Sequence, residues 1–236
     1  MPDRAERSLT QPVPPEAPSV PDVPPDPTRF LNRDLQWLEF NRRVLHQAVD
    51  ARMPLLERVR FLSIFSNNLD EFFMKRVGGL RRQMDAGVGS PAWETLTPAQ
   101  QLHAIRTKVL DLIATQDDCY RKDILPKLRE IGVHFLSWEE LEPHERSEAE
   151  AWYRRNVFPI LTPLAVDPGH RFPFISNMSV SLGVMLRRPG ESEQLFARVK
   201  VPELGSRLYR FEGTKRFVPL QEIIEHNLDD LFPGME

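Results

Sequence analysis

The stretch 61–83 constrains the fold more than any other, because it places a polar segment inside a helical pattern. Its apolar residues recur at spacings of three and four, which predicts helix: Leu62, Phe65, Leu69, Phe72 and Phe73. Asn67 and Asn68 interrupt the run, and asparagine is a poor helix former but a good N-cap. We therefore expect either two helices that meet at these asparagines or one helix that kinks there. Asn68 and Glu71 have the spacing and the polar groups of a capping box, with Asn in the place of Ser or Thr.

A helix that begins at this polar segment has a chemical consequence. Its free amide N–H groups and partial positive charge can receive a phosphate, whereas Asp70 and Glu71 in the first turn would repel an anion. The side-chain amide of Asn68 offers a donor and an acceptor to a base or a ribose. Two interpretations stay open: Asn68 contacts a ligand, or both asparagines only cap and kink the helix.

Residues 29–128 have the pattern of a helical bundle. We expect one helix over 32–51 with Asn32 as its cap, a second with Pro54 in its first turn, and a third from 98 to about 128. Glycines and prolines between the second and third of these helical segments predict a loop. Helices joined by short links are typical of an antiparallel bundle.

Residues 129–236 change to a mixed pattern. Strands are expected at 131–136, 178–186, 195–201, 208–211 and 216–218, and helices at 142–157 and 221–231. Three prolines forbid a long helix between 158 and 168. The predicted fold class is therefore α+β: an N-terminal antiparallel helical bundle is followed by a domain with an antiparallel sheet and flanking helices.

Composition excludes several classes of protein. Residues 1–28 hold nine of the 22 prolines, which predicts a disordered tail. A net charge of −3 gives no indication of nucleic-acid binding, and no run approaches the roughly 18 apolar residues of a membrane span. The single cysteine, Cys119, cannot form an internal disulfide, so we expect a packing residue in a reducing cytoplasm. No cysteine or histidine spacing indicates a metal site.

Several motifs carry a family resemblance. NRDLQWLEFNRRVL at 32–45, PLLERVRFL at 54–62 and SNNLDEFF at 66–73 resemble the N-terminal domain of the long bacterial polyphosphate kinases. FPILTPLAVDP at 158–168 and FPFISN at 172–177 resemble the opening of that family's second, or head, domain. The resemblance covers about 29–236 and implies a helical N-terminal domain at 29–128 and a head domain at 129–236 that is incomplete at its C-terminal end.

The resemblance also implies an activity. Members of this family transfer the γ-phosphate of ATP reversibly to polyphosphate through a phosphorylated histidine, with Mg²⁺ accompanying the nucleotide. The family's histidine stands in a His-x-Lys setting in a later domain, and none of the six histidines here has a lysine two positions on. We therefore expect no catalytic residue and no metal ligand in this chain, and no transferase activity of the chain alone.

The resemblance assigns one site residue, and charge patterns suggest others. Asn68 matches the asparagine that the family uses as an ATP contact. Lys75, Arg76, Arg81 and Arg82 form a basic group after it that either lines a route for polyphosphate or is a solvated helix face. Arg171 either meets phosphate oxygens or belongs to a structural connection.

The expected function is the N-terminal portion of an ATP:polyphosphate phosphotransferase. Its partners would be ATP and polyphosphate, and the head domain would support a homo-oligomer and the polyphosphate tunnel. A cytoplasmic location is expected, with peripheral membrane association left open, and no nucleic acid and no transmembrane segment are expected. The alternative is a non-catalytic helical binding or dimerisation module, which shares the fold without the ligand.

Overall fold

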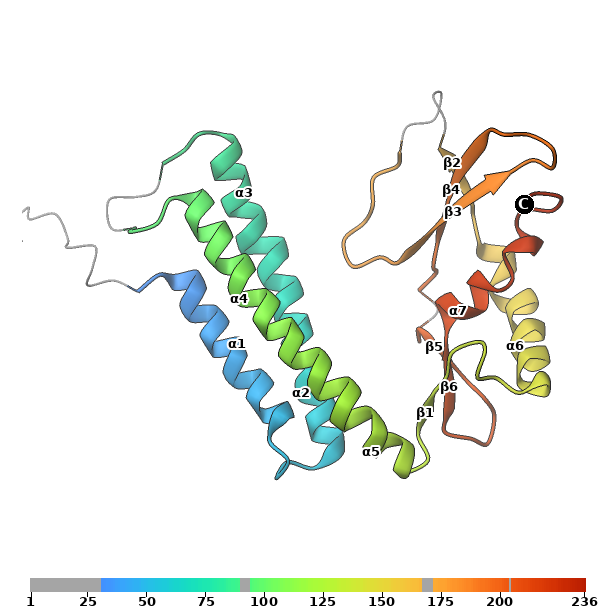
Figure 1. The fold of residues 1–236 in the computed structure, drawn as a ribbon, viewed down its shortest axis with the longest axis horizontal. Helices are drawn as coiled ribbons and strands as arrows, with labels where there is room; N and C mark the ends of the chain where they lie inside the picture. The colour runs from blue at the N-terminus through green and yellow to red at the C-terminus, as the bar shows by residue number, and fades with distance from the viewer. Residues whose placement is uncertain (1–30, 90–93, 167–171, 204) are drawn as a thin grey trace, which may run out of the picture.

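The computed structural model describes residues 31–89, 94–166, 172–203 and 205–236. Figure 1 shows a region of long helices on one side and a mixed α+β region on the other, connected by the segment between helix α5 and strand β1. The tail expected at 1–28 lies outside the described residues. None of the described helices is both long enough and apolar enough to cross a membrane.

The first helices follow the sequence pattern, but their expected break is wrong. The chain forms α1 over Arg33–Val49, α2 over Leu55–Phe72, a π-helical segment over Phe73–Val77 and α3 over Gly78–Asp85. Asn32 caps α1 as predicted, because its Oδ1 accepts the backbone N–H groups of Asp34 at 3.1 Å and Leu35 at 3.0 Å. Asn67 and Asn68 lie inside α2, so they neither cap nor separate two helices.

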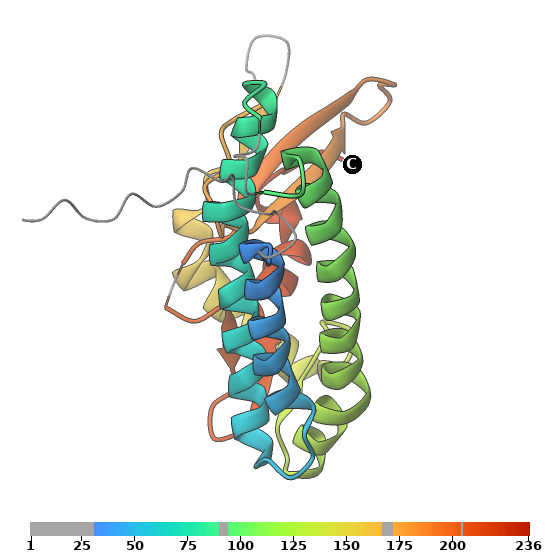
Figure 2. The ribbon, with the colours of Figure 1, turned by 90° about the vertical axis from the view of Figure 1, so that its left-hand side faces the viewer.

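The third arm of the bundle is also nearly continuous. It comprises α4 over Pro98–Asp118, a π-helical segment over Cys119–Ile124, and α5 over Leu125–Glu130. Thr97 and Gln100 form a capping box that fixes its start. Figure 2 shows α1 in front of the α2–α3 arm, with α4 beside them. These helices enclose one apolar core, which includes Leu38, Leu45, Phe65, Leu69, Phe72, Ile105 and Val109.

The α+β class is confirmed, but the described strands form two small sheets rather than one antiparallel sheet. In the first, the order is β1 (His134–Phe135), β6 (Arg216–Pro219), β5 (Leu208–Arg210), and β1 pairs with β6 in parallel. In the second, the order is β2 (Leu164–Val166), β4 (Gln194–Lys200), β3 (Ser181–Arg187), with both pairings antiparallel. Strand β2 was not expected, because it lies in the proline-rich stretch.

Two helices cover this region. They are α6 over Pro143–Asn156 and α7 over Leu220–Glu225. The last helix is shorter than predicted, because the chain continues as a 3₁₀ turn over Leu228–Asp230. A second apolar core joins these helices to the strands and includes Tyr153, Val199, Val218, Ile223 and Ile224.

Candidate functional site

A pocket of about 310 Å³ lies along the seam between α1 and α2. Three contacts across the seam order its walls: Asp34 meets Arg76, Trp37 meets Phe72, and Asn41 meets Asn68. This order follows from the antiparallel course of the two helices. The residues that line the pocket are Arg33, Asp34, Trp37, Phe40, Asn68, Glu71, Phe72, Lys75 and Arg76.

One end of the pocket is rich in cations. Arg76 donates from Nε to Asp34 Oδ1 at 2.8 Å and from Nη2 to Asp34 Oδ2 at 3.1 Å, a bidentate pair. This hydrogen bonding with Asp34 raises the pKa of Arg76 above its usual value. Lys75 pairs with Glu71 one turn earlier, and Arg33 is exposed. The pairing leaves the carboxylate of Asp34 buried, whereas about half of the Arg76 side chain faces solvent.

The middle of the pocket is aromatic. Trp37 and Phe72 stack with ring centroids 4.7 Å apart and an angle of 9° between their planes. Phe72 is buried in the helical core, whereas Phe40 is exposed at the rim. A flat apolar surface next to cations suits a ligand that combines a planar ring with negative charge.

The other end of the pocket presents an amide. Asn68 donates from Nδ2 to Asn41 Oδ1 at 2.9 Å, and Asn41 donates from Nδ2 to the backbone carbonyl of Phe65 at 3.1 Å. Asn41 is completely buried, whereas Asn68 lies between the core and solvent. The amide of Asn68 is therefore tied to the interior on one side and borders the pocket.

The structure brings together three of the residues singled out from the sequence. Asn68, Lys75 and Arg76 line the pocket; Arg82 is exposed and does not line it. Arg171 lies outside the described residues. Six further residues line the pocket that the sequence did not indicate as site residues: Arg33, Asp34, Trp37, Phe40, Glu71 and Phe72. The sequence did offer an indication for Trp37 and Phe40, because an aromatic residue at the edge of an apolar helix face often borders a groove.

The described residues offer no cluster of three or more His, Cys, Asp or Glu side chains that could hold a metal ion. In the pocket itself, Asp34 is engaged by Arg76 and Glu71 by Lys75. Carboxylate oxygens are the ligands that Mg²⁺ prefers in proteins. In the pocket, the two carboxylates that could serve as such ligands are both paired with cations.

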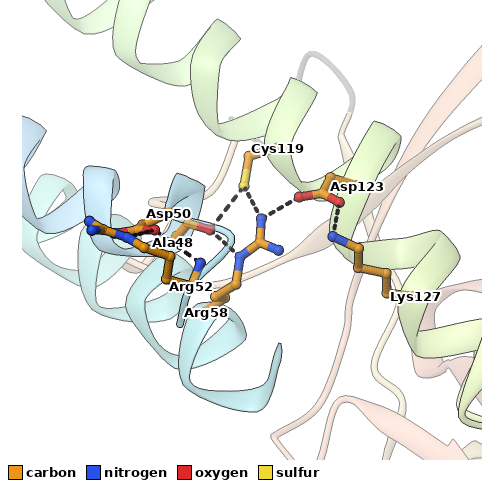
Figure 3. A network of polar contacts seen from close by, with 7 residues as sticks. All are labelled: Ala48, Asp50, Arg52, Arg58, Cys119, Asp123 and Lys127. Atoms are coloured by element: carbon orange, nitrogen blue, oxygen red, sulfur yellow. Dashed lines mark hydrogen bonds and ion pairs between the residues drawn. The ribbon is translucent and has the colours of Figure 1, made fainter. Parts of the chain in front are cut away.

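The opposite end of the α1–α2 seam is closed by a polar network around the buried side chain of Arg58 (Figure 3). Arg58 donates from Nε to the carbonyl of Ala48 at 2.6 Å and from Nη2 to Asp123, which also pairs with Lys127. Cys119 is buried beside them, and its thiol lies 3.5 Å from the same Ala48 carbonyl. Cys119 is thus a packing residue, as predicted.

The fold and the pocket define a helical domain with an anion-compatible site, followed by a small α+β domain. Residues 30–136 match the family described as polyphosphate kinase N-terminal domain, and residues 144–236 match the polyphosphate kinase middle domain. Together the two matches cover most of the chain in the order that the motifs indicated. The chain belongs to the polyphosphate kinase family.

Individual relatives agree. The chain is 44% identical to the polyphosphate kinase of Parasynechococcus marenigrum over 221 residues, which are 89% of this chain and 31% of the relative. It is 46% identical to that of Streptomyces coelicolor over 208 residues, 88% of this chain and 28% of the relative. The crystal structure of polyphosphate kinase from Porphyromonas gingivalis superposes with a TM-score of 0.74 at 30% identity, covering 88% of this chain and 31% of that chain. The chain thus spans about 30% of the length of these relatives.

Proposed function

We propose that this chain is the N-terminal portion of an ATP:polyphosphate phosphotransferase and that its α1–α2 pocket contributes to ATP binding. One observation carries the proposal: a single seam brings together an amide, an aromatic pair and several cations. A nucleoside triphosphate combines the matching groups, since it has a base with hydrogen-bonding edges, a planar ring and a polyanionic tail.

The order of the groups along the seam suggests how the nucleotide lies. Asn68 and Arg76 are eight positions apart, which is roughly 12 Å along a helix. That length is similar to an extended nucleoside triphosphate. The base would lie at Asn68 and the phosphates at Lys75 and Arg76, where Arg76 can exchange Asp34 for phosphate oxygens. Polyphosphate would meet the same cations as the phosphates of ATP.

The chemistry of transfer would belong to other parts of the longer protein. Capture of the γ-phosphate on a histidine divides one difficult transfer into two easier steps, and positioning supplies much of the remainder. None of the six histidines here is in the His-x-Lys setting. We therefore expect the chain alone to hold nucleotide, delivered as its Mg²⁺ complex, without transferring phosphate. Because ATP is the expected substrate, we also expect the protein to be located in the cytoplasm.

The head domain at 129–236 is proposed to mediate self-association, separately from the bundle at 29–128. Several large apolar side chains there are exposed: Phe158, Ile160, Leu164, Phe172, Phe174, Ile175 and Met178. Phe174 has 91% of its surface exposed, which is unusual for an aromatic residue. Analytical ultracentrifugation of the chain and of Phe174→Glu tests this: the variant should shift toward monomer, and equal sedimentation of both would contradict the proposal.

Isothermal titration of ATP with Mg²⁺ into the 236-residue chain and into Asn68→Ala tests the proposed nucleotide site. The variant loses one hydrogen bond to the ligand, so binding should weaken roughly fivefold. Asn67→Ala is the matched control, because Asn67 is adjacent but exposed and outside the pocket lining. Absence of ATP binding, or equal binding by both variants, would contradict the proposal and favour a non-catalytic binding or dimerisation module.

A further inference from the structure

We infer that the exposed face of α4 pairs with the same face of a second copy of this chain, with the two helices antiparallel. This interaction surface is separate from the nucleotide pocket and from the association proposed for the head domain. It consists of a stripe of four exposed residues on α4 whose order is self-complementary: Arg106, Leu110, Ile113 and Asp117.

The stripe lies on the side of α4 that the bundle leaves uncovered. Helix α4 packs against α1 and α3, and Figures 1 and 2 show it at the outside of the helical region. The apolar residues of α4 that the helical core encloses are Ile105, Val109 and Leu112. By contrast, Leu110 has 53% and Ile113 has 44% of its surface exposed. Two large apolar side chains on neighbouring turns are therefore left in contact with water.

The spacing of the stripe suits a partner helix. Its members follow one another at intervals of four, three and four residues, which is the spacing of the seam in a coiled coil. With 3.6 residues per turn, such residues lie in one narrow strip along the helix. His103 and Tyr120 extend the strip by three residues at each end, and both are exposed. A second helix lying along this strip would cover Leu110 and Ile113.

The order of residues in the stripe selects a second copy as that helix. Arg106 stands as far before the midpoint of the stripe as Asp117 stands after it, and Leu110 and Ile113 are related in the same way. A two-fold axis at this midpoint brings Leu110 against Ile113 of the second copy. The same axis brings Arg106 against Asp117 of the second copy, and each contact occurs twice. An isologous interface requires this mirrored order, whereas an unrelated partner does not.

The charged residues are available for these contacts and determine the direction of pairing. Within the described part of the chain, Arg106 makes no ion pair. Asp117 accepts from Nε of Arg121 at 2.6 Å, and 53% of its side chain remains accessible, so a second cation can reach it. A parallel pair in register would place Arg106 against Arg106 and Asp117 against Asp117. Repulsion between these like charges disfavours the parallel arrangement.

Pairing through α4 leaves the nucleotide pocket open. All the residues that line the pocket belong to α1, α2 and the π-helical segment that follows α2. The affinity for ATP should therefore be the same in chains that pair and in chains that do not, which keeps this inference independent of the proposed nucleotide site.

Charge reversal tests the inference in a Phe174→Glu background, which removes the association proposed for the head domain. Analytical ultracentrifugation of this 236-residue chain should show a weak dimer, with a dissociation constant on the order of 10–100 µM. Arg106→Asp or Asp117→Arg places like charges at both ends of the stripe and should weaken the dimer at least about tenfold. The two substitutions together restore opposite charges and should return the constant to within about threefold of its starting value.

Asp118→Arg is the matched control for these reversals. Asp118 is adjacent to Asp117 and likewise pairs with a cation one turn on, Lys122, but it lies outside the stripe. The control should dimerise like the starting chain. Circular dichroism spectra should be the same for all these variants, because the substituted side chains are exposed.

Disulfide trapping in a Cys119→Ala background reads the direction of pairing. A mixture of Leu110→Cys chains and Ile113→Cys chains should cross-link faster than either variant does with itself, since the antiparallel pair brings these two positions together. Faster cross-linking of each variant with itself would show a parallel pair and overturn the inference.

The remaining outcomes also separate this surface from the head domain. A Phe174→Glu chain that stays monomeric up to about 1 mM overturns the pairing of α4 and agrees with association through the head domain alone. Reversals that leave the dissociation constant unchanged, or a combined variant that stays as weak as the single ones, overturn the pairing as well. If Phe174→Glu changes nothing while Arg106→Asp weakens association, the head-domain proposal fails and the pairing of α4 stands.

Discussion

The two arginine–aspartate pairs at opposite ends of the α1–α2 seam have opposite burial. In the pocket, the aspartate is buried and the arginine is exposed, with 4% of the Asp34 side chain and 48% of the Arg76 side chain accessible. At the closed end, 2% of the Arg58 side chain is accessible, compared with 38% for Asp123. Each pair has one member in a π-helical segment.

The difference indicates which pair is structural and which can serve a ligand. Arg58 is enclosed by groups that use its donors, namely the Ala48 carbonyl at the end of α1 and the Asp123 carboxylate. No ligand could reach it without opening the core. Arg76 lines the pocket and, among the described residues, hydrogen-bonds to the carboxylate of Asp34 alone, so a phosphate can compete for it.

Arg58→Met should cause the largest loss of stability, about 3 kcal/mol. The substitution leaves the Ala48 carbonyl with only the weak thiol donor of Cys119 among the described side chains. Asp123 keeps Lys127 and partial exposure, so the cost should lie at the low end of the range for a broken buried pair. Urea unfolding followed by circular dichroism measures the change. ATP affinity of the folded variant should not change.

Arg60→Met is the matched control for this prediction. Arg60 lies two positions on, is exposed and pairs only loosely with Glu57 at 3.7 Å. Its loss should change stability by less than about 0.5 kcal/mol. Equal unfolding midpoints for the two variants would show that burial does not separate the two kinds of arginine.

Arg76→Gln should mainly affect binding, with ATP affinity about tenfold weaker. Stability should fall by only about 1 kcal/mol, because the Nε2 of glutamine can still donate to the buried carboxylate of Asp34 in place of the arginine Nε. Asp34 also lies in the first turn of α1, where the helix dipole favours a carboxylate. Titration calorimetry and urea unfolding together measure both effects. Arg82→Gln is the control, since Arg82 does not line the pocket. A larger effect on stability than on binding would reverse the assignment of the two ends.

The helices of the bundle could be predicted from the sequence because their cause is local. The apolar spacing that continues from Phe65 through Leu69 to Phe72 crosses the two asparagines without interruption, and this should have outweighed their poor helix propensity. Arg58 lies at the same helical spacing, on the N-terminal side of these residues, and this spacing indicates a core position. Its partner Asp123 is 65 positions away, and no local pattern could identify that contact.

The sheets and the site depend on contacts between distant segments. Strand β1 pairs in parallel with β6, joining His134 to Arg216, so the division into two sheets is set by tertiary packing rather than by strand propensity. Asn68 was identified through a motif, but its surroundings come from α1. Its hydrogen-bond partner Asn41 is 27 positions earlier, and this contact could be recognised only once the two helices were placed together.

The middle domain contains a pair like that of Asp34 and Arg76, a buried carboxylate with a more exposed arginine, and its contribution to stability can be tested by changing the pH. Glu145 is buried and pairs with the more exposed Arg216, like Asp34 with Arg76. Hydrogen bonding from Arg216 lowers the pKa of Glu145. A lowered folded-state pKa stabilises the fold above the unfolded-state pKa, and this contribution is lost as the pH falls through the folded value.

We therefore expect stability to fall by roughly 1 kcal/mol more in the native chain than in Glu145→Gln between pH 6 and pH 3. Glutamine keeps an oxygen that can accept the N–H of Glu142, so the capping contact is preserved while the charge is removed. Urea midpoints at several pH values measure the difference. Parallel curves for the two proteins would show that a buried carboxylate with an exposed arginine adds no stability.

Cys119→Ala should have the smallest effect, a loss of about 0.5–1 kcal/mol. The thiol packs beside the closed network and its sulfur lies 3.9 Å from Arg58 Nη2, but the stronger contacts of Arg58 go to Ala48 and Asp123 and survive the substitution. In the native chain, the buried thiol should react with a disulfide reagent only at the rate of unfolding or local opening. Fast reaction in the folded protein would show that the closed end opens, and Arg58 would then be as accessible as Arg76.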